Sequence, residues 1–196
     1  METVLDHFQL EFVTGDQLLS KYHDYSISDA GRWVITDKFY KQQLSQCNVG
    51  IFITYMPSNF HLRQICALIL GIYTNDESNT KTKLSIELLC AKRFFDDKSL
   101  SPAFGQYLIY KLYTYLSPDE LVIHDVSEHI SSYYQHLGFQ IDSYITEDRY
   151  NMVIPKDQTL SDYFDQSKLY LDQKQSKFYH YIISNPLLLE EALSCP

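Results

Sequence analysis

The segment from Leu84 to Phe139 changes its hydrophobic period several times, and this order constrains the fold more than any other feature. Leu84 to Ala91 alternates with the period of a strand, and Phe104 to Leu116 carries apolar residues at helical spacing. Leu121 to Val126 is a second apolar strand. A helix between two strands of one sheet usually connects parallel neighbours, so we expect parallel pairing in the centre of the sheet.

Further strand and helix patterns surround this unit. Strands are predicted over Phe8 to Val13, Asn48 to Met56, Gln64 to Thr74, Phe139 to Ile145 and Tyr150 to Pro155, and helices over Asp16 to Tyr22, Thr36 to Gln46 and Glu128 to His136. Consecutive strands joined by turn residues form antiparallel neighbours. The predicted fold class is therefore α/β (α+β), with a mixed, mostly antiparallel twisted sheet of about seven strands and flanking helices.

The chain changes character at Gln158, where Tyr-rich and Gln-rich helical sequence begins. We expect one domain over residues 1–157 and a helical C-terminal extension over 158–196. Two roles stay open for the extension. Its leucines, namely Leu187, Leu188, Leu189 and Leu193, pack back on the domain, or its aromatic side chains contact a protein partner or a second copy of the chain.

The strand from Leu84 to Ala91 carries one carboxylate among apolar neighbours. Strict alternation puts Ser85, Glu87 and Leu89 on one face and Ile86, Leu88 and Cys90 on the other. Glu87 is a candidate general base on this basis, and it is equally explained as a solvated or salt-bridged strand residue.

Charge and composition argue against several classes of function. The net charge of −9 disfavours nucleic acid and anionic membranes, which attract clustered Lys and Arg, so we expect neither as a partner. The four cysteines are scattered without metal-ligand spacing, and no metal is expected. The N-terminus has no basic region followed by an apolar run, so we expect a cytoplasmic protein.

The most specific motif lies on a helix that ends at a glycine. The residues Ser131-Ser132-Tyr133-Tyr134-Gln135-His136-Leu137-Gly138-Phe139 are very similar to the f-Y-x-x-x-G-F signature of the GNAT superfamily of N-acetyltransferases. Taken alone, Y-x-x-x-G-F also describes an ordinary amphipathic helix with a glycine C-cap. The motif follows strand, loop, helix and strand, as in the family, and the order of elements resembles the family over residues 1–157.

A second motif precedes the helix that begins at Phe104. Leu100-Ser101-Pro102-Ala103-Phe104-Gly105 resembles the family's Q/R-x-x-G-x-G/A loop, with Leu100 in place of Gln or Arg and Ala103 in place of Gly. Independently of the family, the free N–H groups and partial positive charge at a helix start favour pyrophosphate. Lys98 could offset the negative charges of Asp96 and Asp97 in this loop. The resemblance thus implies that residues 1–157 bind acetyl-CoA as the cofactor.

The resemblance also implies roles for individual residues. Glu87 would accept the amine proton through a water, the Leu89 N–H would polarise the thioester carbonyl, and Tyr134 would protonate the departing thiolate. Tyr133 points elsewhere on the helix and is only a substitute for Tyr134. The expected cofactor contacts are Leu89, Ala91, Lys98, Ser101, Ala103, Phe104, Gly105, Gln106, Ser127 and Tyr134.

Two of the polar residues have alternative roles. Ser127 stands where many relatives carry an Asn that contacts the cofactor, and it is also suited to cap the helix that starts at Glu128. His124 is a second base candidate, although a strand histidine is more often simply packed.

Together these motifs predict an acyl-CoA-dependent N-acetyltransferase, an enzyme that transfers acetyl from acetyl-CoA to a primary amine of a protein or a small molecule. The alternative is a catalytically degenerate GNAT-fold binding module that acts through a protein partner.

Overall fold

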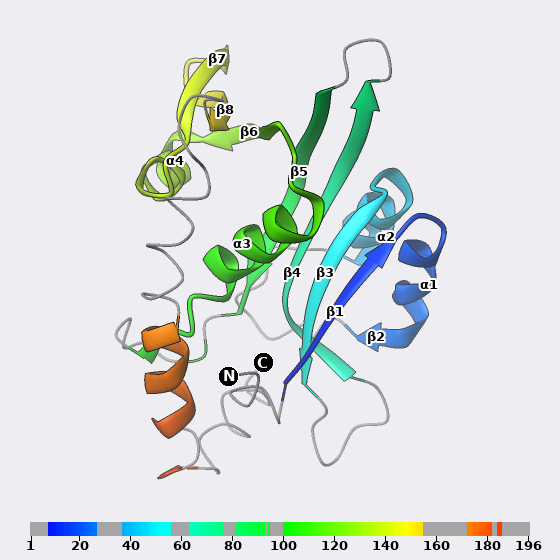
Figure 1. Cartoon of the computed structure of the whole chain (residues 1–196), viewed down its shortest axis with the longest axis vertical. Helices are drawn as coiled ribbons and strands as arrows, with labels where there is room; N and C mark the ends of the chain where they lie inside the picture. Colours follow the sequence, from blue (N-terminus) through cyan, green and yellow to red (C-terminus); the bar gives the residue numbers. More distant parts are fainter. Residues whose placement is uncertain are drawn as a thin grey trace.

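The computed structural model describes residues 8–26, 37–55, 63–76, 81–92, 94, 100–154, 172–181 and 184–185 (Figure 1). The elements are β1 (Phe8–Thr14), α1 (Gln17–Asp24), β2 (Tyr25–Ser26), α2 (Asp37–Gln46), β3 (Val49–Tyr55), β4 (Arg63–Asp76), β5 (Lys81–Ala91), α3 (Phe104–Leu116), β6 (Glu120–Ser127), α4 (Glu128–His136), β7 (Gln140–Thr146) and β8 (Arg149–Ile154). A further helix covers residues 172–181. All predicted strands and helices of the domain are present, with bounds shifted by a few residues.

The strands form one sheet in the order β1-β3-β4-β5-β6-β8-β7, and the short β2 pairs with β4. Along this path every pair of neighbours is antiparallel except the central pair, β5 and β6, which is parallel. The sheet is therefore mixed and mostly antiparallel, and both the predicted fold class and the predicted central parallel pair are confirmed.

The parallel pairing of β5 with β6 is short. It runs from Lys83 opposite Glu120 to Ile86 opposite Ile123. Beyond Ile86, β5 continues to pair with β4, whereas β6 pairs with β8. The two central strands are thus joined at one end only and part at the other, which leaves an opening in the hydrogen-bonded ladder of the sheet (Figure 1).

Asp119 holds the closed end of this pair in register. Its Oδ2 accepts hydrogen bonds from the N–H of Thr82 at 2.8 Å and from the Thr82 hydroxyl at 3.0 Å. The Asp119 N–H donates in return to the carbonyl oxygen of Thr82 at 3.0 Å. These bonds fix the point where the chain enters β6 after α3.

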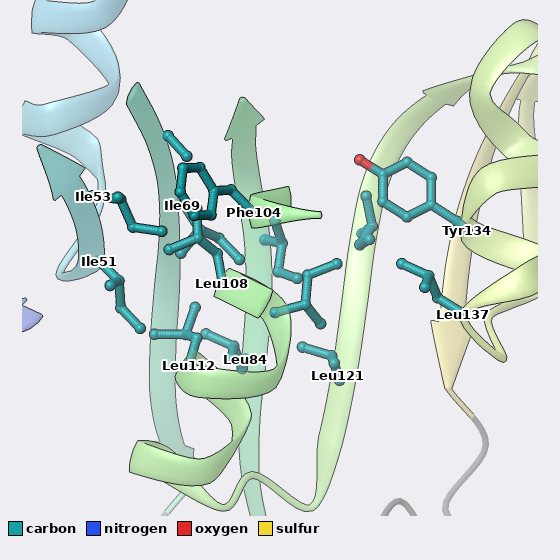
Figure 2. Close-up of a cluster of buried hydrophobic side chains, with 14 of the residues drawn as sticks. Ile51, Ile53, Ile69, Leu84, Phe104, Leu108, Leu112, Leu121, Tyr134 and Leu137 are labelled. Atoms are coloured by element: carbon teal, nitrogen blue, oxygen red, sulfur yellow. The ribbon is translucent and has the colours of Figure 1, made fainter. Parts of the chain in front are cut away.

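Helices cover both faces of the sheet. One core cluster contains residues of α3 and α4 against the inner strands (Figure 2), with Phe104, Leu108, Ile109 and Leu112 buried on α3. The other cluster contains Leu18 of α1 with Tyr40 and Leu44 of α2, packed against Phe52, Leu68 and Leu70. The sheet therefore has an α3/α4 face and an α1/α2 face.

The helix at residues 172–181 adds a buried aromatic side chain to the first cluster. Phe178 is 3% exposed, and its ring centroid lies 6.1 Å from that of Phe8, 5.2 Å from that of Phe94 and 6.1 Å from that of Phe104. This helix, orange in Figure 1, thus packs beside the start of α3. The predicted packing of Leu187 to Leu189 and of Leu193 concerns residues outside the described part of the chain.

None of the helices in the described segments has both the length and the apolar character that crossing a bilayer requires.

Candidate functional site

A β-bulge lies on β5 immediately beyond the last parallel pair. Ile86 is opposite Gly71 of β4, but the next paired residue of β5, Leu88, is opposite Leu70. Glu87 is therefore the extra residue of the bulge. Bulges of this kind bend a strand and redirect side chains, and here the bend coincides with the opening between β5 and β6.

The bulge overturns the expected alternation on this strand. Leu88 and Cys90 were expected on the face of Ile86, but both pack with the cluster on the α1/α2 face. Leu89 packs with the opposite cluster, the one that contains Ile86. One extra residue shifts the side-chain period by one position, so the predicted face is wrong for every residue after Glu87.

Glu87 lies on the α1/α2 face at the rim of the opening. The Ser85 hydroxyl donates a 2.6 Å hydrogen bond to its Oε1. The Glu87 charge also contributes to raising the pKa of Cys47, a member of the α1/α2 cluster, where burial is the larger cause. The carboxylate is half-buried, which leaves it within reach of a substrate or a water in the opening.

Leu89 and Ala91 lie along the edge of β5 that does not pair with β6. They pair with Ile69 and Ala67 of β4 on one side only. Because strand backbone groups point alternately to the two sides, this edge presents N–H and C=O groups that an extended ligand could bond as an added strand would.

The start of α3 offers free N–H groups beside this edge. The first bond within the helix runs from the Tyr107 N–H to the Ala103 carbonyl oxygen at 3.0 Å. The N–H groups of Phe104, Gly105 and Gln106 precede that bond and have no acceptor within the helix. Together with the helix dipole they favour an anion.

Gly105 keeps this helix start close to its surroundings. A Cβ at position 105 would lie 3.1 Å from the Tyr133 hydroxyl oxygen, 3.9 Å from the Ala91 Cβ and 4.0 Å from Leu89 Cδ2. The helix start, the edge of β5 and the Tyr133 phenol therefore meet at one place, and the absence of a Cβ at position 105 allows this close approach.

The loop before α3 adopts a glycine-like conformation without a glycine. Ala103 has φ 52° and ψ 37°, in the left-handed region that Gly adopts most easily. The strain amounts to about 1–2 kcal/mol for a residue with a Cβ. Ser101 accounts for part of the turn, because its Oγ accepts a 3.3 Å hydrogen bond from the Ala103 N–H. Lys98 lies outside the described residues.

Tyr134 projects from α4 into the cluster on the α3/α4 face, with its hydroxyl directed toward the side that α3 occupies (Figure 2). It is 7% exposed, and its ring contacts those of Tyr133 and Phe139 at centroid distances of 5.1 and 5.8 Å. Burial, followed by the nearby Cys90, raises the pKa of Tyr134 to about 12. The phenol is thus protonated at neutral pH and able to act as an acid.

Gly138 ends α4 in the way that the motif predicts. It has φ 88°, and the following Phe139 N–H donates a 3.0 Å hydrogen bond to the Tyr134 carbonyl oxygen. This closing bond fixes the end of the helix turn that carries the phenol.

Ser127 occupies the N-cap position of α4 but makes no side-chain capping bond. The Glu128 N–H donates instead to the Asp148 carbonyl oxygen at 2.8 Å. The half-buried Ser127 therefore does not cap α4 through its hydroxyl, and its contact with a cofactor stays a prediction.

His124 lies on β6 with its side chain exposed rather than packed. Its Nδ1 is 3.0 Å from Oδ1 of Asn151 on β8. Asn151 was not among the residues singled out from the sequence, although an Asn between Tyr150 and Met152 is a polar interruption of an apolar strand and could have drawn attention.

The strand order and the open central strand pair identify the fold of this chain. The chain has the GNAT fold, a mostly antiparallel open sheet flanked by helices. It is similar to the solved KacTA–DNA complex, with 14% identity, a TM-score of 0.52, and 81% of this chain and 99% of the other covered. It is also similar to AtaTR bound with AcCoA, with 15% identity, a TM-score of 0.52, and 82% and 99% covered.

A third similar structure is the AtaT Y144F mutant toxin bound to the C-terminus of the antitoxin AtaR, with 15% identity, a TM-score of 0.51, and 77% and 94% covered. No family model and no curated protein matches the sequence. At these identities the likeness concerns the fold alone.

Proposed function

We propose that this chain transfers the acetyl group of acetyl-CoA to a primary amine, with Glu87 as a water-mediated base and Tyr134 as the acid. One observation carries the proposal. β5 and β6 part beyond the pair Ile86 and Ile123, with Glu87 on the α1/α2 face and Tyr134 with the start of α3 on the other. An amine and a thioester can thus approach each other from opposite faces.

The α3/α4 face fits acetyl-CoA. The N–H groups at the start of α3 suit the pyrophosphate, and the free edge of β5 at Leu89 and Ala91 suits the amide groups of pantetheine. Gly105 allows the start of α3 to approach the Ala91 side chain closely. Ser101, Phe104, Gln106 and Ser127 complete the proposed contacts, and the similar AtaTR structure is one bound with AcCoA.

The chemistry needs three groups around the thioester. The amine must lose a proton before its lone pair attacks the carbonyl carbon, and Glu87 takes that proton through a water. The Leu89 N–H stabilises the negative charge that develops on the carbonyl oxygen. The new C–N bond forms, the C–S bond breaks, and Tyr134 donates its proton to the departing thiolate.

The acceptor amine is proposed to enter from the α1/α2 face, where Glu87 favours a cationic group. Nucleic acid is not proposed as a partner, because the net charge of −9 opposes it even though one similar structure is a complex with DNA. Residues 1–157 form the proposed acetyl-CoA domain. We propose that the extension, 158–196, serves chiefly to complete this domain, supported by the packing of Phe178.

The test compares two variants of the same shape at the start of α3. Acetyl-CoA should raise the melting temperature of the wild type, since a ligand of the native state stabilises it. Gly105→Asp should abolish that shift because the added charge repels pyrophosphate, although an acidic residue in the first helical turn stabilises the free protein. Gly105→Asn, which differs only in charge, should retain part of the shift.

If saturating acetyl-CoA leaves the melting temperature of the wild type unchanged, the proposal is refuted. Shifts in both variants as large as that of the wild type would instead show that the cofactor binds away from the start of α3. Thiol release with a panel of amines then measures transfer itself.

A further inference from the structure

A second β-bulge lies on β6, directly across the opening from the first. Ile123 is opposite Met152 of β8, and the next paired residue of β6, Val126, is opposite Tyr150. Two residues of β6, His124 and Asp125, are therefore opposite the single residue Asn151. Both central strands thus bulge at the first residue after the pair Ile86 and Ile123.

The two bulged residues, Glu87 and His124, share one face of the sheet. Ile86 and Ile123 both belong to the cluster under α3 and α4, so the residue that follows each of them points to the opposite face. The contact of His124 with Asn151 supports this face for His124. Tyr150 and Met152 belong to the cluster under α3 and α4, so Asn151 between them points to the opposite face. The two side chains therefore flank the opening on the face from which the amine is proposed to enter.

The Asn151 side chain fills the bulge and fixes the state of the imidazole. Its Oδ1 accepts a hydrogen bond from the Asp125 N–H at 3.4 Å, and its Nδ2 donates to the Ser143 hydroxyl at 3.0 Å. A backbone N–H can only donate, so the oxygen of the amide must face β6. His124 Nδ1, 3.0 Å from that oxygen, must then carry the proton. In the neutral ring the lone pair is left on Nε2.

Arg149 supports the same bulge from the other side. Asp125 has φ 57°, and the Arg149 guanidinium donates to its carboxylate Oδ2 at 2.6 Å and to its carbonyl oxygen at 3.4 Å. An aspartate tolerates this left-handed conformation better than most residues, but it still needs such support to persist. The orientation of His124 is therefore built from β6, β7 and β8 together.

The reaction has a place for a second proton acceptor. An ammonium group that becomes an amide loses two protons from its nitrogen, one before attack and one as the C–N bond is completed. One proton equivalent ends on the CoA thiol and the other in solvent. Glu87 can accept only one of the two, and an imidazole with a lone pair on Nε2 is suited to take the other and pass it to solvent.

We infer that His124 is this second acceptor, a catalytic residue that takes the amine's other proton on Nε2, and that Asn151 and Ser143 are its positioning residues. The inference rests on the proposed acetyl transfer and adds to it a group that acts on the acceptor side. Exposure of the ring lets it return the proton to water after each turnover.

The first test observes the tautomer without any reaction. Long-range proton–nitrogen spectra of the uniformly 15N-labelled full chain should show His124 as the Nδ1–H form at alkaline pH. The spectrum of His124→Gln assigns the signal. Asn151→Ala should return it to the Nε2–H form that free histidine favours, and Asn151→Asp, which keeps an acceptor oxygen, should preserve Nδ1–H. An Nε2–H signal in the wild type would overturn the inference.

The second test measures transfer from acetyl-CoA to three probes: a lysine peptide, a peptide with a free N-terminal serine, and spermidine. For the best probe, His124→Gln should lower kcat by about 10–100-fold while the KM for acetyl-CoA stays unchanged. Asn151→Ala should lower kcat by a smaller factor, and Asn151→Asp should restore it. His129→Gln, a change at an exposed histidine of α4, is the control and should have no effect.

The outcomes separate the two proposals. Full kcat in His124→Gln, in an enzyme that does transfer acetyl, would overturn the role of His124 and leave the proposed function intact. A wild type that neither binds acetyl-CoA nor acetylates any probe would refute the proposed function, and the inference would fall with it.

Discussion

The Ser85 hydroxyl donates a 2.6 Å hydrogen bond to Oε1 of Glu87, so one oxygen of this carboxylate is held by a neighbour two residues away. Because both residues lie on β5, the strand itself orients the base. The hydroxyl is buried, which protects the bond from competition by water.

Glu87→Gln should lower kcat by about 100-fold, since an amide can still accept the Ser85 hydrogen bond but cannot take up a proton. The melting-temperature shift with acetyl-CoA should persist, because the cofactor binds on the other face. Glu120→Gln, at an exposed glutamate where β6 begins, is the matched control. Undiminished turnover in Glu87→Gln would remove this residue from the mechanism.

Tyr134→Phe should keep the fold and acetyl-CoA binding but lower kcat by about 10–100-fold, because the ring packs as before while the acid is lost. With a pKa of about 12, the wild-type phenol stays protonated up to pH 10, so it should add no alkaline limb to the rate profile below that pH. Tyr150→Phe, in the same cluster, is the control. Equal rates in the two variants would show that Tyr134 is only a packing residue.

Ala103→Gly should raise the free energy of unfolding by about 0.5–1 kcal/mol. Gly adopts the observed φ of 52° without strain, and this gain exceeds the cost of the entropy that Gly adds to the unfolded chain. Ser117→Gly, at φ 45° beyond the other end of α3, should have a similar effect far from the proposed pyrophosphate site. Urea unfolding measures both. Destabilisation by Ala103→Gly would contradict the left-handed conformation of this loop.

Phe178→Ala should lower the free energy of unfolding by about 3 kcal/mol, as expected for a large aromatic side chain removed from a core. Gln173→Ala, at an exposed position of the same helix, should change it by less than about 0.5 kcal/mol. Chemical denaturation of the full chain compares them. Equal stability of both variants would mean that the helix is not part of the folded unit.

The buried thiols should make the protein sensitive to alkaline pH. Burial raises the pKa of Cys66 to about 12 from an ordinary value of 9.0, and Cys47 and Cys90 shift likewise. A group with a raised native pKa contributes stability that is fully present below its unfolded pKa and lost as the pH rises from there toward its native pKa. Between pH 8 and pH 10, Cys66 should account for a loss of about 1 kcal/mol.

Cys66→Ala should therefore show a smaller decline in unfolding free energy between pH 8 and pH 10 than the wild type, whatever its stability at pH 8. In the folded wild type the buried thiols of Cys47 and Cys66 should also react slowly with Ellman's reagent at pH 8. A pH dependence unchanged by the substitution would show that Cys66 is not shielded.

The helices and strands were predictable because burial imposes a period on the sequence. α3 and α4 begin and end at the predicted residues, since a helix that packs one face must repeat its apolar residues at helical spacing and the glycine at 138 ends α4. The order of elements then sufficed to predict the central parallel pair.

The geometry of the site was harder to predict from the sequence, because it depends on the register between strands that are distant in sequence. No local pattern distinguishes Glu87 as a bulged residue, since the bulge exists only relative to Gly71 and Leu70 of β4. The same holds for His124, whose orientation depends on Asn151 of β8. A strict period of two was therefore the wrong assumption at the one place where the strands part.

The packing of Phe178 against Phe8 and Phe104 has a consequence for biosynthesis. A ribosome delivers Phe178 long after Phe8, so the aromatic cluster beside the start of α3 cannot close while the strands and α4 are being made. The strands and α4 can assemble earlier, but the proposed cofactor end of the domain must wait for a helix translated long after it. A nascent chain is thus unable to complete this end of the molecule until Phe178 has left the ribosome.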